Sequence, residues 1–323
     1  MTGVIRLGTR GSRLALWQAE YVRARLENDQ PDALFETVII TTTGDRLKDT
    51  PLPAMGGKGL FTAELEGALR DGSIDLAVHS LKDLPTQIPS DLAVGAVLSR
   101  ADPSDVLVSR GGFTLASLPG GARIGTSSTR RKAQLLAHRP DLRVLDVRGN
   151  ADTRLRKAFD ERAPYDAIAV ARAALERLGE LWAVSDVLPE EIMLPAPGQG
   201  ALAVECRNEQ GSLDLVRRLN DFVTDIETRA ERSFLDALGG GCAVPVAARG
   251  RCGDGVRLQI SGRVSAIDGS RQIDVVGDVP LPVHGGARRL AEETGKALAA
   301  QARSKGADVL LDDARSSREG SGV

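Results

Sequence analysis

Short apolar runs alternate along the chain with stretches in which apolar residues recur at helical spacing. Apolar or β-branched runs predict strands at residues 4–7, 36–42, 76–78, 143–147, 166–171 and 201–206. After the first run, one helical face would carry Leu14, Trp17, Tyr21, Val22 and Leu26. Strands that alternate with helices indicate α/β units. A break in the pattern at residues 100–104 indicates a hinge between two such units.

The stretch from residue 75 to residue 85 has ionisable side chains directly after an apolar run. Residues 76–78 predict a buried strand, and Pro85 favours a turn over a helix. The polar side chains between them are His79, Ser80, Lys82 and Asp83. Open α/β sheets bind ligands at strand ends, so we expect a site here. From these residues alone, the alternative that Asp83 caps a turn and Lys82 is solvated stays open.

The turn after the first predicted strand has the features of an anion site. Residues 8–12 form the turn, and Ser12 is a candidate N-cap for the helix that follows. Backbone N–H groups at such a helix start can bind a phosphate or a carboxylate. Arg10 and Arg13 flank this point. Many turns of this kind bind nothing, so the signal is weak by itself.

A second group of hydroxyl and arginine side chains follows the strands after the hinge. Small hydroxyl residues open a predicted helix at Thr126, Ser127 and Ser128, and Arg130 and Arg131 come next. Later strands are followed by Arg148 with Gly149, by Arg154 and by Arg177. Arginines that repeatedly follow strand ends would meet at one sheet edge and hold a ligand with several carboxylates or phosphates. The alternative is a solvated basic surface.

The C-terminal third predicts a small α+β domain. A capping box at Thr224 and Glu227 opens a helix that ends at residues 239–241, three glycines, with Cys242 directly after them. We expect Cys242 on a loop that can approach a ligand closely. Strands follow at 244–248, 257–264 and 272–276, then a helix at 285–302 and a last strand at 307–311. Residues 313–323 are polar, and we expect them to be disordered.

Composition removes several classes of function. The net charge of the 323 residues is −2 and aromatics make up 3%, which disfavours nucleic-acid binding. No run of eighteen apolar residues predicts a membrane span, and the N-terminus lacks a signal-peptide core. Three cysteines and no signal peptide indicate a reducing compartment, the cytoplasm. The cysteines and the three histidines are scattered along the sequence, so they do not predict a metal site.

Several motifs, in this order, resemble those of the porphobilinogen deaminase (hydroxymethylbilane synthase) family over essentially the whole chain. The motifs lie at residues 14–19, 56–61, 78–85, 125–131, 148–150, 197–200 and 241–245. The resemblance implies two doubly wound α/β domains like those of periplasmic binding proteins and a small α+β domain. It implies domain bounds of 1–99 with 200–218, 104–195 and 222–312, ahead of the tail.

The resemblance also implies a chemistry. Four porphobilinogen molecules would be joined head to tail, with loss of ammonia at each step, and water would release hydroxymethylbilane for tetrapyrrole synthesis. A dipyrromethane cofactor, made from substrate, would be held by a thioether to Cys242. Asp83 would be the catalytic carboxylate, because it could stabilise the cation left by ammonia and move protons. The family resemblance suggests a monomer.

Each pyrrole ring carries an acetate and a propionate, so the growing chain is a polycarboxylate. The resemblance implies that the cofactor is bound by Ser80, Lys82, Asp83, Thr126, Ser128, Arg130, Arg131, Arg148, Gly149 and Cys242. It implies that the substrate is bound by Arg10, Ser12, Lys58, Arg148, Arg154, Arg177 and Gln199. The main alternative is a bilobal module that binds or senses a polyanion without chemistry. Cys242 and the extra domain argue against that alternative.

Overall fold

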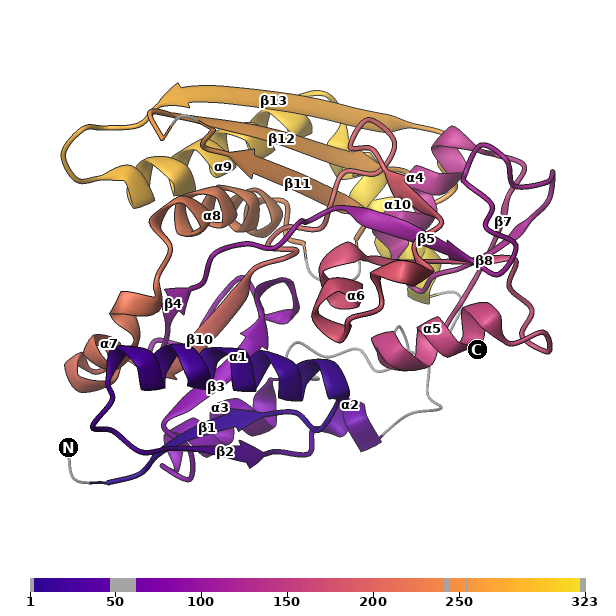
Figure 1. The fold of residues 1–323 in the computed structure, drawn as a ribbon. Helices are drawn as coiled ribbons and strands as arrows, with labels where there is room; N and C mark the ends of the chain where they lie inside the picture. Colours follow the sequence, from indigo (N-terminus) through magenta and orange to yellow (C-terminus); the bar gives the residue numbers. More distant parts are fainter. Residues whose placement is uncertain (1–2, 47–61, 241–243, 254, 320–323) are drawn as a thin grey trace. The chain divides into compact units, whose positions relative to one another are not determined.

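The computed structural model describes residues 3–46, 62–240, 244–253 and 255–319 (Figure 1). These residues form two compact units. The first unit comprises Met1–Ala101 with Gly200–Asp225, and the second comprises Asp102–Gln199 with Ile226–Val323. The division into three domains therefore stays a prediction. Within the described residues, no helix is both long and apolar enough to cross a membrane.

The first unit is built on a five-stranded sheet in the order β2-β1-β3-β10-β4. Its strands are β1 (Ile5–Thr9), β2 (Phe35–Ile39), β3 (Leu76–Ser80), β4 (Leu92–Val97) and β10 (Leu202–Arg207). β1 is parallel to β2 and β3, whereas β10 is antiparallel to β3 and β4. The predicted strand at 201–206 thus does return to the first sheet.

Helices cover both faces of the first sheet. The helices of this unit are α1 (Arg13–Asp29), α2 (Thr43–Arg46), α3 (Ala63–Arg70) and α7 (Gln210–Val216), with 3-10 turns η2 (Leu81–Asp83) and η4 (Arg217–Leu219). Leu76 and Val78 share a core cluster with Val22 of α1. The residue between them, Ala77, packs instead with Leu65 of α3. This alternation confirms the doubly wound arrangement, because successive side chains of a strand point to opposite faces.

The second unit contains a sheet of the same plan, in the order β7-β6-β8-β5-β9. Its strands are β5 (Asp105–Ser109), β6 (Arg123–Gly125), β7 (Arg143–Leu145), β8 (Ala167–Ala171) and β9 (Asp186–Leu188). The helices are α4 (Thr129–His138), α5 (Ala151–Phe159) and α6 (Arg172–Leu178), with the 3-10 turn η3 (Leu181–Ala183). β8 is buried along its whole length, as expected for an apolar strand covered on both faces.

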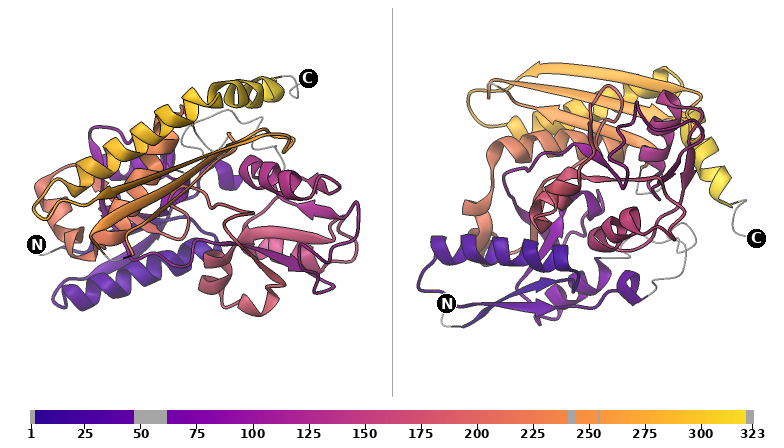
Figure 2. Two further views of the ribbon diagram at one scale, coloured as in Figure 1. Left: turned by 90° about the horizontal axis from the view of Figure 1, so that it is seen from above. Right: turned by 45° about the vertical axis from the view of Figure 1, so that its right-hand side comes forward.

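The second unit also holds a three-stranded antiparallel sheet of β11 (Val246–Arg251), β12 (Arg257–Ser265) and β13 (Gln272–Pro280). Its helices are α8 (Phe222–Ala237), which belongs to this unit from residue 226, α9 (Ala287–Ser304) and α10 (Ala307–Glu319). Figures 1 and 2 show α9 running along this sheet, where it packs on β12 and β13. The predicted α+β character of the C-terminal third is confirmed.

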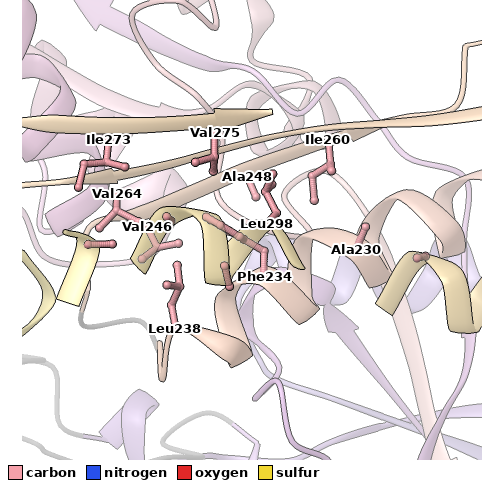
Figure 3. Close-up of a cluster of buried hydrophobic side chains, with 14 of the residues drawn as sticks. Ala230, Phe234, Leu238, Val246, Ala248, Ile260, Val264, Ile273, Val275 and Leu298 are labelled. Carbon is pink, nitrogen blue, oxygen red and sulfur yellow. The ribbon is translucent and has the colours of Figure 1, made fainter. Parts of the chain in front are cut away.

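Phe234 of α8 is fully buried at the centre of the core beneath this sheet (Figure 3). Gly262 of β12 faces the ring, and a Cβ at residue 262 would come within 2.6 Å of Phe234 Cζ. Glycine at residue 262 thus lets the strand lie directly on the aromatic ring. The contact fixes the distance between β12 and α8.

One prediction for the C-terminus is wrong. Residues 307–311 are not a strand, because they belong to α10. Residues 313–319 continue the same helix, and the disorder expected of the tail stays a prediction. The buried residues Ala307, Leu310, Leu311 and Ala314 have helical spacing and leave Val309 exposed. A short apolar run cannot be assigned to strand or helix by its length, and here the helical period of burial decides.

Candidate active site

In the first unit, the polar stretch after β3 lies at the carboxyl end of a parallel strand, as predicted. Ser80 ends β3, and its Oγ accepts a hydrogen bond from Gln18 Nε2 of α1 at 2.9 Å. Leu81 is buried and its N–H donates to Ala201 O at 3.0 Å. The 3-10 turn anchored in this way leaves Lys82 half-buried and Asp83 exposed. The Asp83 side chain therefore lies at the surface on a turn that is anchored through Leu81.

His79, the residue directly before Ser80, forms a buried pair of ionisable side chains with a residue of β10. His79 Nε2 is 3.1 Å from Glu205 Oε2 of β10, and the side chains are 5% and 0% exposed. Neither oxygen of Glu205 has a hydrogen bond of good geometry among the described residues. His79 was expected in the site from sequence, whereas Glu205 was not. A single carboxylate inside the apolar run at 201–206 was the available signal.

Ser12 and Arg10 both have protein partners. Ser12 is the N-cap of α1, as predicted, and its Oγ accepts from Ala15 N at 3.2 Å. Arg10 donates to both carboxylate oxygens of Asp45, at 3.1 Å from Nε and 2.5 Å from NH2. Burial alone would raise the pKa of Asp45, but hydrogen bonds from Arg10 and Thr42 outweigh it and lower that pKa. A ligand carboxylate at Arg10 would compete with Asp45.

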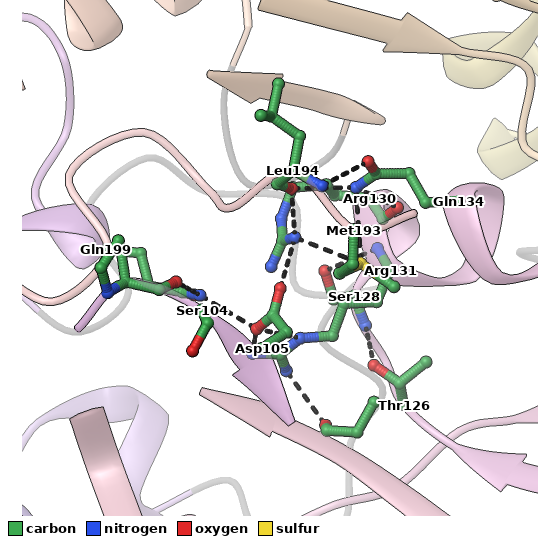
Figure 4. A network of polar contacts seen from close by, with 12 residues as sticks. Ser104, Asp105, Thr126, Ser128, Arg130, Arg131, Gln134, Met193, Leu194 and Gln199 are labelled. Atoms are coloured by element: carbon green, nitrogen blue, oxygen red, sulfur yellow. Dashed lines mark hydrogen bonds and ion pairs between the residues drawn. The ribbon is translucent and has the colours of Figure 1, made fainter. Parts of the chain in front are cut away.

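In the second unit, Asp105 lies between two arginines at the start of β5 (Figure 4). Arg130 NH1 donates to Asp105 Oδ2 at 2.7 Å. Arg131 donates to Asp105 Oδ1 from Nε at 3.0 Å and from NH2 at 2.7 Å. Asp105 is fully buried, and each arginine side chain is 6% exposed. The consecutive arginines of the sequence analysis thus meet, but in the interior and on a shared carboxylate.

Gln199 belongs to the same buried group. It is 0% exposed, and its Nε2 donates to Asp105 Oδ1 at 2.9 Å and to Pro103 O at 2.7 Å. An amide nitrogen carries two protons, so both are used within the protein. Gln199 therefore fixes Asp105 against the segment that enters β5. The sequence analysis placed Gln199 in the site and did not foresee Asp105, which directly follows the predicted hinge.

The remaining contacts of the two arginines with the described residues are to neutral acceptors. Arg130 NH1 also contacts Leu194 O at 2.8 Å and Met193 Sδ at 3.6 Å. Arg131 NH1 donates to Ala169 O at 3.2 Å. Figure 4 shows Met193 and Leu194 beside the guanidinium of Arg130. Within the described part of the chain, two positive charges are therefore buried here with one negative charge.

The pKa shifts of Asp105 and Arg130 follow from the burial of these charges. Burial alone would raise the pKa of Asp105, but attraction to Arg130 and Arg131 outweighs it and holds that pKa well below its ordinary value. Burial lowers the pKa of Arg130, Asp105 raises it, and the neighbouring Arg131 lowers it again, with a net fall. Asp105 is thus firmly ionised, and the group has surplus positive charge.

Gln134 of α4 extends this network to the three-stranded sheet. Its Nε2 donates to Leu194 O at 3.0 Å and lies 3.5 Å from Met193 Sδ. Its Oε1 accepts from Arg263 NH1 of β12 at 3.1 Å, and Arg263 Nε pairs with Asp274 at 2.7 Å. Gln134 thus links the network around the arginines of α4 to β12.

The three hydroxyl residues before α4 make local contacts. Ser128 is the N-cap of α4 and its Oγ accepts from Arg131 N at 3.4 Å. Ser127 Oγ donates to Val147 O and accepts from Val147 N, at 2.9 and 3.0 Å. Thr126 is buried and its Oγ1 accepts from Ser128 N at 3.3 Å. These bonds shape the turn that presents Arg130 and Arg131.

The later arginines are half-buried. Arg154 Nε donates to Gly149 O at 2.8 Å, which links two predicted site residues. Gly149 has φ of +104°, where an L side chain is strained. Arg148 and Arg177 are each half-buried on this unit. Lys58 and Cys242 lie outside the described residues.

The family models and the most similar sequence relatives agree on one family. The family model "Porphobilinogen deaminase, dipyromethane cofactor binding domain" matches residues 5–214, and "Porphobilinogen deaminase, C-terminal domain" matches residues 226–304. The porphobilinogen deaminase of Syntrophomonas wolfei subsp. wolfei is 46% identical over 96% of this chain and 99% of its own. That of Syntrophotalea carbinolica is 45% identical over 96% of each chain. Among solved structures, the LysR-family regulator CbnR has a TM-score of 0.41 and 13% identity, over 68% of this chain and 70% of CbnR.

Proposed function

The chain belongs to the porphobilinogen deaminase family, and from that premise we propose which of its residues carry the reaction. The enzyme is a transferase that joins porphobilinogen units on a dipyrromethane cofactor. We assign it the full hydroxymethylbilane synthase reaction, in which four substrate molecules are joined before water releases the product. When bound, the cofactor supplies the pyrrole carbon to which the first substrate is joined and anchors the growing chain.

The buried group around Asp105 fits a cofactor that carries carboxylates. It holds two guanidiniums and one carboxylate within residues 5–214, the part that matches the cofactor-binding family model. A carboxylate arm of the cofactor would balance the remaining positive charge, since buried charges are stable only when paired. This charge surplus is the observation that carries the proposal. We assign the cofactor's carboxylates to Arg130 and Arg131, with further contacts from Ser80, Lys82, Thr126, Ser128, Arg148 and Gly149.

Asp83 is proposed as the catalytic carboxylate. Its exposure at the end of a parallel strand, on a turn anchored by Leu81, supports that role. A carboxylate held beside a pyrrole N–H stabilises the positive charge that develops as ammonia leaves, and can accept and return a proton. Lys82, next to it, would bind a carboxylate of the cofactor.

For the substrate we propose Arg10, Ser12, Lys58, Arg148, Arg154 and Arg177. For Gln199 we propose another role than the substrate contact expected from sequence, because both protons of its amide nitrogen are already donated to Pro103 and Asp105. We propose that it acts through Asp105, by holding that carboxylate in place. Cys242 is proposed as the thioether anchor on the family resemblance alone. A monomer in the cytoplasm that binds no nucleic acid also remains a prediction.

The test of the catalytic assignment is Asp83→Asn, with Asp91→Asn as its control. Both residues are exposed aspartates of the first unit, and Asp91 pairs with Arg70 away from the β3 turn. We expect Asp83→Asn to lower the rate of ammonia release from porphobilinogen by about 100-fold or more, as for loss of a general acid–base. Asp91→Asn should keep the wild-type rate. Equal rates in both variants would remove Asp83 from the mechanism, and a wild type that binds porphobilinogen without releasing ammonia would favour the binding module.

A further inference from the structure

Gln134 of α4 is buried, at 1% exposed, and its amide pairs with both backbone groups of one residue. Its Nε2 donates to Leu194 O at 3.0 Å, and its Oε1 accepts from Leu194 N at 2.9 Å. Two facing residues of an antiparallel sheet exchange the same pair of hydrogen bonds. The side chain of Gln134 thus takes the place of a neighbouring strand and fixes the backbone of Leu194.

The carbonyl of Leu194 in turn helps to orient Arg130. It accepts from Arg130 NH1 at 2.8 Å, and the same nitrogen donates to Asp105 Oδ2 at 2.7 Å. NH1 carries two protons, so these two acceptors use both. Because a guanidinium is planar, two acceptors at one nitrogen fix the plane of the whole group. The direction of the edge formed by Nε and NH2 therefore depends on where Leu194 O lies.

Gln134 can hold Leu194 in place because it is itself held. Its Oε1 also accepts from Arg263 NH1 of β12 at 3.1 Å. Arg263 pairs with Asp274 through Nε and NH2, at 2.7 and 3.0 Å. Two donors face Oε1, so the oxygen and nitrogen of the amide cannot exchange places without losing both contacts. Figure 4 shows Gln134 beside Leu194 and Arg130.

We propose that Gln134 is a positioning residue, which sets the direction of Arg130 toward the cofactor through the carbonyl of Leu194. The inference rests on the proposed function and deepens it, because it adds to Arg130 a residue that acts on the cofactor only through it. The role needs a side chain that both donates and accepts at one end. An ionised glutamate cannot donate, and methionine offers only a weakly accepting sulfur.

Two variants of Gln134 separate positioning from stability. Gln134→Glu keeps an acceptor for Leu194 N and Arg263 NH1, but it places an oxygen against Leu194 O. Gln134→Met keeps the length of the side chain, removes the amide and adds no charge. Gln30→Met is the matched control, because Gln30 Nε2 also donates to a backbone carbonyl, Leu215 O, at 2.9 Å in the first unit.

The first readout is the steady-state release of ammonia from porphobilinogen, counted per folded molecule. We expect kcat to fall about tenfold or more in both variants of Gln134, because rates drop steeply when a reacting group is misplaced. KM should stay near the wild-type value, since the proposed substrate residues are unchanged, and Gln30→Met should keep both constants. A wild-type kcat in either variant of Gln134 would overturn the proposal. A loss in Gln134→Glu alone would be an effect of its charge.

The second readout is stability, measured by urea unfolding. Gln134→Glu should unfold at a higher urea concentration than Gln134→Met, because it keeps both acceptor contacts of Oε1. If residue 134 served stability alone, both variants would turn over at the wild-type rate wherever they are fully folded. Hydrogen exchange at the Leu194 amide checks the contact itself. Exchange should be faster in Gln134→Met than in the wild type, and an unchanged exchange rate would remove the proposed link.

The intact mass of the denatured wild type separates failure of this proposal from failure of the proposed function. A wild type without attached pyrroles or turnover would refute the proposed function, and the positioning role with it. A wild type that carries the pyrroles, beside a variant of Gln134 with undiminished kcat, would refute the positioning role alone. Gln134→Glu keeps the test decisive if Gln134→Met does not fold, because its turnover at the wild-type rate would by itself overturn the proposal.

Discussion

Removal of the charge of Asp105 should be among the most destabilising single changes in the chain. Asp105→Asn keeps the size of the side chain but leaves Arg130 and Arg131 buried without the protein carboxylate that they share. An asparagine oxygen in place of Oδ1 could still accept from Arg131 and Gln199. The amide nitrogen would then face Arg130 NH1, a donor, where Oδ2 accepts at 2.7 Å in the wild type.

The magnitude follows from these contacts. The lost bond between Arg130 and Asp105 is charge-assisted and contributes about 1.5–3 kcal/mol. The buried guanidiniums left behind add a penalty, so the total lies near the range of about 3–5 kcal/mol for a broken buried ion pair. With an m value of about 3 kcal/mol per molar urea, the unfolding midpoint should fall by about 1–2 M.

The stability difference between the wild type and Asp105→Asn should also depend on pH. The pKa of Asp105 in the folded protein is held well below its ordinary value of 3.8. A group with a depressed pKa contributes stability that is fully present above its ordinary pKa and is lost as the pH falls toward the folded pKa. The difference between wild type and Asp105→Asn should therefore be constant from pH 7 to about pH 5 and shrink below pH 3.8.

The assay is urea unfolding followed by circular dichroism, with Asp141→Asn as the control. Arg139 lowers the pKa of Asp141 to about 2, but this pair lies at the surface, with Asp141 43% exposed. Surface pairs of this kind contribute little to stability, so the control should keep the wild-type midpoint. If Asp105→Asn unfolds at the same urea concentration as Asp141→Asn at pH 7, the buried ion pair does not stabilise the fold as argued.

Two further predictions concern buried ionisable groups. His79→Leu should lower the free energy of unfolding by about 3–5 kcal/mol, because it leaves the Glu205 carboxylate buried without its partner. The double variant with Glu205→Leu should be more stable than His79→Leu. If the losses of the two single variants simply add in urea unfolding, the pairing is contradicted. Burial, with the nearby charge of Glu205, raises the pKa of Cys206 to about 11. Cys206 should therefore resist an aromatic disulfide reagent at pH 8 until the protein is denatured, and labelling of Cys206 in the native protein, located by peptide mass, would count against that.

Local pattern was enough to predict much of the fold and part of the site. The turn after β3 lies at a strand end as expected, and Ser12 caps α1 as predicted from its place before an amphipathic stretch. Asp105 could not be identified, because its partners are 25, 26 and 94 residues away in sequence. A lone aspartate beside a hinge carries no local sign of such partners.

The errors have physical causes too. Residues 307–311 contain a short apolar run that suits either a strand or a helix, and only packing against the core of the second unit decides for the helix. Arginines were expected to face a ligand because they follow strands. Arg10, Arg130 and Arg131 do lie at such ends, but each first satisfies a protein carboxylate. Charge surplus, rather than the presence of arginine, therefore marks the group that can take a ligand anion.

The proposed transferase builds its product on a pyrrole cofactor attached to its own chain through Cys242. The mass of the intact, denatured protein tests it most directly, before and after Cys242→Ala. The wild-type mass should exceed that of the 323-residue chain by two linked pyrrole units, and the mass of the variant should equal that of its chain alone. A wild type with no added mass, or the same added mass in Cys242→Ala, would contradict it.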